Sequence, residues 1–131
     1  KVLIMDEPTN GLDIPSKITF RNMIKESFKQ DRIVIITSHQ VRDLDELINA
    51  IIIMDDGKIL LNNDKTEISE RLQFELSDVP KNESDLIYQE KVSNGYATIK
   101  ENTTHISGYV DIELLFNAVL ANKLNIKTFL N

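Results

Sequence analysis

Two acidic residues stand side by side directly after an apolar run early in the sequence. Asp6 and Glu7 follow the apolar residues 2–5, and Pro8 comes next. In an α/β context such a run indicates a strand buried on both faces, and ligands of open α/β sheets bind beyond the carboxyl ends of the strands. Since proline disfavours the helical region for the residue before it, we expect Glu7 to be extended and its carboxylate to point in a fixed direction. Such a pair could hold a divalent cation and orient a water molecule.

A histidine follows the next predicted strand. Residues 33–37 form a second apolar run, and Ser38 and His39 come at its carboxyl end. Because parallel strands end at the same edge of a sheet, we expect His39 to lie near Asp6. This position gives His39 a functional interpretation, whereas His105 lies in a polar stretch without a motif and is interpreted as a surface residue.

Periodic patterns predict the elements that position these side chains. A helix capped by Asp13, with Pro15 in its first turn, runs to about residue 29 and connects the two strands. A short helix over residues 41–49 and a strand over 50–54 follow, and Asp56-Gly57 predicts a hairpin that returns over 58–61. This order predicts an α/β fold, a parallel sheet with flanking helices and an added hairpin. One face of the long helix is expected to be apolar, with Ile14, Ile18, Met23, Ile24 and Phe28.

Residues 64–131 have a different character and predict a small α+β extension. We expect a short helix over 66–71 capped by Thr66, strands over 72–76, 86–92 and 96–100, a helix over 111–122 and a last strand over 127–130. The chain therefore divides into residues 1–63 and 64–131. The second part would be regulatory, or a structural cap on the first.

The first 13 residues, KVLIMDEPTNGLD, resemble the Walker B motif and D-loop of ATP-binding cassette (ABC) proteins, and residues 37–39 resemble the switch motif, or H-loop. The resemblance implies part of a P-loop NTPase-like sheet. It implies that Asp6 acts on the magnesium ion, that Glu7 is the catalytic carboxylate and that His39 contacts the γ-phosphate. Asp13 would act at the nucleotide across a dimer of two ATPase domains. ATP and Mg²⁺ are the cofactors implied for the full-length protein.

Other parts of such an enzyme are missing from the sequence. With 4 glycines, none in the pattern Gly-x-x-x-x-Gly-Lys-Ser/Thr, the chain has no phosphate loop, and it has no signature motif or glutamine loop. We therefore expect the carboxyl-terminal part of a longer ATPase. By itself it should bind no nucleotide tightly and hydrolyse none. It should also self-associate through exposed strand edges and apolar surface.

Composition excludes several classes of protein. The 131 residues include no cysteine, which excludes a disulfide scaffold and a thiolate metal site. The formal net charge of −6 argues against a nucleic-acid partner. The apolar runs are far shorter than the roughly 20 residues that span a bilayer.

The residues up to 61 resemble the transporter branch of the ABC family, and residues 111–122 resemble the extensions of bacterial exporters. This implies an ATP-binding subunit that works in the cytoplasm, at the inner face of the cell membrane, with a second ATPase subunit and a transmembrane permease. Two alternatives stay open: a regulatory or dimerisation module without catalysis, and part of a soluble ABC ATPase of repair or translation. An upstream phosphate loop in the gene, or a neighbouring permease gene, would discriminate between these alternatives.

Overall fold

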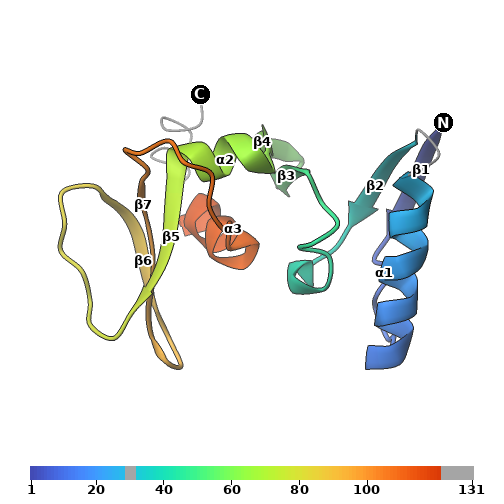
Figure 1. Cartoon of the computed structure of the whole chain (residues 1–131), viewed down its shortest axis with the longest axis horizontal. Helices are drawn as coiled ribbons and strands as arrows, with labels where there is room; N and C mark the ends of the chain where they lie inside the picture. Colours follow the sequence, from blue (N-terminus) through green and yellow to red (C-terminus); the bar gives the residue numbers. More distant parts are fainter. Residues whose placement is uncertain (29–31, 122–131) are drawn as a thin grey trace. The chain divides into compact units, whose positions relative to one another are not determined.

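The computed structural model describes residues 1–28 and 32–121. The chain forms two compact units, Lys1–Ile48 and Asn49–Asn131, and helices and strands occur in both (Figure 1). The α/β part of the predicted fold class is thereby confirmed. No helix in the described ranges is long and apolar enough to span a membrane. The predicted strand over 127–130 lies outside the described residues, and the domain division after residue 63 stays a prediction.

The first unit is built on two parallel strands. β1 (Val2–Asp6) and β2 (Ile33–Thr37) pair in parallel over their whole length, from Val2↔Ile33 to Asp6↔Thr37. Between them in the sequence lies α1 (Ile14–Phe28). Both strands and the connecting helix agree with the prediction, and the register brings the two strand ends to the same edge.

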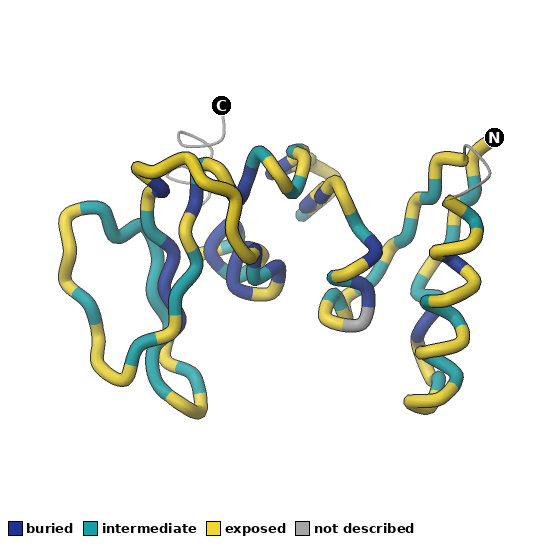
Figure 2. The backbone as a smooth tube through the Cα atoms, in the orientation of Figure 1, coloured by how far each residue is buried: buried dark blue, intermediate teal, exposed yellow. Residues whose placement is uncertain are grey.

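Only one face of this strand pair is covered. Ile24 of α1 is buried and packs with the partly buried Phe20, Met5 and Ile36. The residues of the opposite face alternate along the strands with Met5 and Ile36, and they are exposed (Figure 2). Ile4, for example, is 68% exposed. The prediction that the strands are buried on both faces is therefore wrong for the described residues.

The predicted apolar face of α1 is wrong as well, because only one of its five members is buried. Ile24 is the buried member. The other four are exposed: Ile14, Ile18, Met23 and Phe28. Two strands span only about 5 Å between their axes, whereas a helix with its side chains is about 10 Å across. A sheet this narrow covers a narrow stripe of the helix, and the stripe contains Phe20 and Ile24.

The segment after β2 forms no α-helix. Only η1 (Val41–Asp43) is helical, of the 3₁₀ type, so the predicted α-helix over 41–49 is wrong. The amide of Leu44 donates to the Val41 carbonyl at 3.1 Å, and the amide of Leu47 donates to the Leu44 carbonyl at 2.8 Å. These apolar residues recur every third position, which is the 3₁₀ period.

The second unit begins with a hairpin that forms a sheet of its own. β3 (Ala50–Asp55) and β4 (Lys58–Asp64) are antiparallel, and Asp56 and Gly57 both have positive φ, of 48° and 70°. The predicted two-residue turn is thus confirmed. Within the described part of this unit, β3 pairs with β4 alone. That the hairpin extends the parallel sheet of the first unit stays a prediction.

Three antiparallel strands and two helices complete the second unit. The strands β5 (Leu72–Ser77), β6 (Leu86–Val92) and β7 (Gly95–Glu101) pair in the order β5-β7-β6. α3 (Ile112–Ala121) packs against β7 and β3, and the core includes Ile68, Leu72, Ile99, Val110 and Leu115. α2 (Lys65–Arg71) starts one residue earlier than predicted, with Asp64 rather than Thr66 in the N-cap position.

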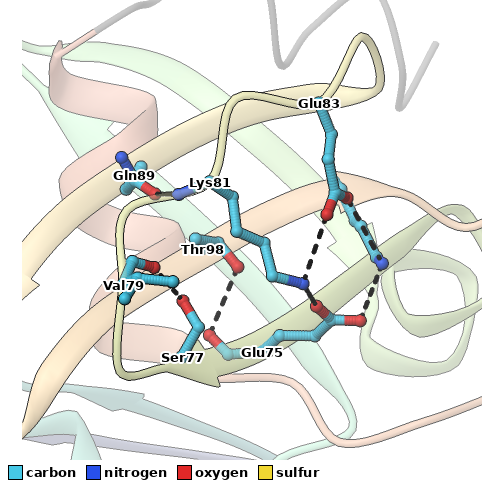
Figure 3. A network of polar contacts seen from close by, with 8 residues as sticks. Glu75, Ser77, Val79, Lys81, Glu83, Gln89 and Thr98 are labelled. Atoms are coloured by element: carbon cyan, nitrogen blue, oxygen red, sulfur yellow. Dashed lines mark hydrogen bonds and ion pairs between the residues drawn. The ribbon is translucent and has the colours of Figure 1, made fainter.

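The loop between β5 and β6 is fastened across the sheet by a polar network (Figure 3). Lys81 in this loop forms an ion pair with Glu75 of β5, and its amide donates to Gln89 Oε1 of β6 at 2.7 Å. Lys100 Nζ of β7 lies 2.8 Å from Glu75 Oε1, and both lysines lie within 4 Å of Glu83. These contacts link the loop to all three strands.

Candidate active site

The ends of β1 and β2 bring the predicted acidic residues beside the Thr37–His39 segment. Asp6 and Thr37 are register partners, so their side chains project from the same face of the sheet. The Thr37 hydroxyl donates to Asp6 Oδ1. The amide of Glu7 donates to the Thr37 carbonyl at 2.9 Å and is also 3.3 Å from Thr37 Oγ1. Parallel pairing therefore extends one residue beyond β1.

The backbone of Glu7 is not extended, contrary to the prediction. Its φ is +45°, in the left-handed region. The amide of Asn10 donates to the Glu7 carbonyl at 3.1 Å, so the chain reverses immediately after the strand. Pro8 disfavours the right-handed helical region at Glu7, and the turn excludes an extended conformation. Such backbone conformations cost about 1–3 kcal/mol and cluster at functional sites.

The Glu7 carboxylate is held by the two residues after β2. His39 Nδ1 lies 2.7 Å from Glu7 Oε1, and the amide of His39 donates to the same oxygen at 3.0 Å. The Ser38 hydroxyl donates to Oε2 at 3.3 Å. The hydrogen bond from the His39 side chain is the main reason that the pKa of Glu7 is lowered from its ordinary value of 4.5. Glu7 is therefore ionised at neutral pH, and an ionised carboxylate can only accept hydrogen bonds, so Nδ1 carries a proton.

Asp13 has a clear structural role at the start of α1. Its Oδ1 accepts a hydrogen bond from the amide of Ser16 at 2.8 Å, which confirms the predicted N-cap. Hydrogen bonding to Ser16 also lowers the pKa of Asp13. Gly11, with φ of 74°, allows the left-handed turn on the way from Glu7 to this cap. The predicted role of Asp13 across a dimer stays a prediction.

The Asp6 carboxylate is the kind of ligand that magnesium takes in proteins. Carboxylate oxygens are the ligands that Mg²⁺ prefers, and Mg²⁺ is usually bound through one or two carboxylates together with substrate phosphates and water. The described residues contain no group of three or more histidine, cysteine or acidic side chains that could cage a metal ion. Asp6 hydrogen-bonds through Oδ1 among the described residues, so its chemistry fits Mg²⁺ if a phosphate and water complete the coordination.

Sequence analysis missed what Thr37 and Ser38 do, although both are in the motif that drew attention to His39. Each donates its hydroxyl proton to one of the two acidic residues. The available signal was the register: Thr37 stands as far along β2 from Ile33 as Asp6 stands along β1 from Val2. Counting along the two predicted strands would have paired them.

Known proteins similar to this chain match it over about half of its length. It is 35% identical over 68 residues to ABC transporter A family member 8 of Dictyostelium discoideum, covering 52% of this chain and 8% of that protein. It is 42% identical over 77 residues to the energy-coupling factor transporter ATP-binding protein EcfA2 of Caldanaerobacter subterraneus. This match covers 56% of this chain and 27% of that protein. It is 33% identical over 76 residues to the galactose/methyl galactoside import ATP-binding protein MglA of Haemophilus influenzae. This match covers 56% of this chain and 15% of that protein.

These matches are partial on both sides. The matched stretch spans only 8% to 27% of the length of these relatives. No protein-family model matches the chain. All three relatives are named as transporter or transport ATP-binding proteins.

Proposed function

Because about half of this chain is similar to ATP-binding proteins of ABC transporters, we propose that it supplies the hydrolytic half of an ABC-type ATPase site. The observation that carries the proposal is the Glu7 carboxylate held between Ser38 and His39, one residue beyond Asp6. Asp6 acts on Mg²⁺, Glu7 on the attacking water and His39 on the γ-phosphate. Bound Mg²⁺ neutralises charge on the phosphate oxygens.

Glu7 is suited to orienting the attacking water. Its lowered pKa keeps the carboxylate ionised at neutral pH, so it can accept a hydrogen bond from the attacking water and orient it. Three donors from residues 38 and 39 fix the carboxylate. Each carboxylate oxygen has two acceptor positions. Oε2 accepts only the Ser38 hydroxyl among the described residues, which leaves it one position for water.

His39 has two ring nitrogens, and the proposed function uses both. Nδ1 donates a hydrogen bond to the Glu7 carboxylate. This contact fixes the ring, and in the proposed function Nε2 is the nitrogen that contacts the γ-phosphate.

The remaining parts of the site come from outside this sequence. The chain contains no phosphate loop or signature motif, so an upstream segment of the same protein would hold the triphosphate. A second ATPase subunit would approach through the D-loop with Asp13. A transmembrane permease would hold the assembly at the inner face of the cell membrane. We retain export as the proposed direction from the resemblance of residues 111–122, although one relative is named for import.

The test compares the 131-residue chain with the full product of the reading frame that encodes it. The full product should hydrolyse ATP in the presence of Mg²⁺, and Glu7→Gln should lower the rate by at least about a hundredfold, the lower end for loss of a general base. Glu101→Gln, an exposed glutamate of β7, is the matched control and should leave the rate unchanged. The chain alone should show no turnover.

Two results would defeat the proposal. One is a full product with no phosphate loop upstream and no Mg²⁺-dependent turnover, which favours a regulatory module. The other is turnover that Glu7→Gln and Glu101→Gln affect equally. Hydrolysis by a full product whose neighbouring genes encode no permease would favour an ABC ATPase of repair or translation instead.

A further inference from the structure

The Thr37 hydroxyl touches both acidic residues of the candidate active site. It donates to Asp6 Oδ1, and it lies 3.3 Å from the amide nitrogen of Glu7. A hydroxyl has one proton to give, and here the proton goes to Asp6, so Oγ1 is the acceptor toward Glu7. The direction of both hydrogen bonds is thereby set.

We propose that Thr37 is a positioning residue that orients the Asp6 carboxylate so that Oδ2 faces the divalent cation. The inference rests on the proposed function, in which Asp6 acts on Mg²⁺. Among the described residues, Asp6 hydrogen-bonds through Oδ1 only, which leaves Oδ2 available for the ion or its water.

The chemistry of magnesium makes this orientation matter. Mg²⁺ requires near-ideal octahedral geometry, and Asp6 is exposed, so burial does not restrict the rotation of its carboxylate. Carboxylates that hold a metal ion are themselves hydrogen-bonded, and loss of such a partner typically weakens metal binding or activity by 10–100-fold. Thr37 is the side chain that provides this hydrogen bond.

The same hydroxyl has little to do with stability. Thr37 is exposed, so water can replace its contact with Asp6. The Glu7 amide keeps its 2.9 Å hydrogen bond to the Thr37 carbonyl whatever side chain is present. Thr37→Val preserves the β-branched shape that suits a strand, and Thr37→Ser preserves the hydroxyl. Together, the two substitutions separate an effect on the orientation of the Asp6 carboxylate from an effect on folding.

The experiment uses Mn²⁺ together with inorganic phosphate on the 131-residue chain. Phosphate completes the metal coordination, and Mn²⁺ shares the oxygen preference of Mg²⁺ and broadens nearby NMR signals. In the wild-type chain the amide signals of Asp6 and Glu7 should broaden as Mn²⁺ is added. Thr37→Val should raise the Mn²⁺ concentration needed by about tenfold to a hundredfold, and Thr37→Ser should restore it. Thr19→Val, which removes an exposed hydroxyl of α1 that donates to the Pro15 carbonyl, is the matched control.

Equal broadening in the wild type and Thr37→Val would overturn the proposal. A Thr37→Ser chain that needs as much Mn²⁺ for broadening as Thr37→Val would overturn it too. If Thr37→Val does not fold, Thr37→Ala takes its place with the same expectation. In the full product, Thr37→Val should raise the Mg²⁺ concentration for half-maximal turnover while the KM for ATP at saturating Mg²⁺ stays unchanged. A full product without turnover defeats the proposed function, whereas the Mn²⁺ result on the chain decides the role of Thr37 separately.

Discussion

Glu7 and His39 form an acid–imidazole pair whose properties can be measured in the chain itself. The 2.7 Å contact with His39 Nδ1 is the largest cause of the lowered Glu7 pKa. His39→Ala should therefore raise the Glu7 pKa toward 4.5, its ordinary value. A carboxyl ¹³C titration by NMR measures it. His105→Ala, which removes the other histidine, should leave the Glu7 titration unchanged.

The sign of the corresponding stability effect follows from linkage. A carboxyl group whose pKa is lower in the folded state stabilises that state above its unfolded pKa, and the contribution is lost as the pH falls through the folded value. His39→Ala should therefore reduce the difference in unfolding free energy between pH 7 and acid pH. An identical Glu7 midpoint in both chains would contradict the role assigned to His39.

The β5–β6 loop is an element whose position depends on a few charged side chains. Lys81 links it to Glu75, and the amide of residue 81 donates to Gln89 Oε1 (Figure 3). Lys81→Met removes the charge but keeps most of the apolar stem. We expect the backbone amide at position 81 to exchange with solvent several-fold faster, while amides of β7 keep their protection.

The matched control for the loop is Lys91→Met, at an exposed position of β6. It should change no amide in the loop, and equal effects of the two substitutions would contradict the assignment. Acid should act like Lys81→Met. Hydrogen bonds from Lys100 and Lys81 lower the pKa of Glu75 from 4.5. The Glu75 carboxylate therefore stabilises the folded state at neutral pH, and this contribution is lost as the pH falls through its lowered pKa.

Elements defined by local signals could be predicted from the sequence, and their neighbours could not. The Asp56-Gly57 turn and the apolar runs of β1 and β2 are local, and they are present as predicted. The spacing of Val41, Leu44 and Leu47 suits both an α-helix and a 3₁₀ helix, so this spacing alone does not distinguish them, and the predicted helix over 41–49 was wrong. Which residues of α1 are buried depends on the width of the sheet that it meets, and no local pattern contains that width.

The candidate site follows the same division. Asp6, Glu7 and His39 could be found because their motif is specific. The left-handed conformation of Glu7 depends on the turn that follows it, and the hydrogen bond from Thr37 to Asp6 depends on strand register. The hydrogen bond is a consequence of pairing between segments about thirty residues apart, and the conformation of Glu7 follows from a turn that the sequence pattern did not predict. They needed the structure.

For the whole molecule, an uncovered apolar face should govern behaviour in solution. The outer face of the β1–β2 pair carries four aliphatic side chains that are 45% to 68% exposed: Val2, Ile4, Ile33 and Ile35. A second copy of the chain offers an identical patch, so two chains can bury the patch against each other about a two-fold axis. Four side chains are far fewer than the 20–30 residues a side of a standard interface. Association should therefore be weak and concentration-dependent.

Ile4→Thr tests this interface because threonine keeps the β-branched shape that suits a strand but removes apolar surface. In a two-fold dimer the substitution removes one isoleucine from each chain, so it should weaken self-association by at least about tenfold, equivalent to about 1.4 kcal/mol. Met23→Thr is the matched control, since Met23 is 64% exposed but lies on α1. Sedimentation velocity over a concentration series measures the effect. A wild-type chain that stays monomeric at every concentration would contradict the proposed interface. Equal weakening by both substitutions would contradict it as well, because Ile4 lies on the face that a second copy would cover and Met23 does not.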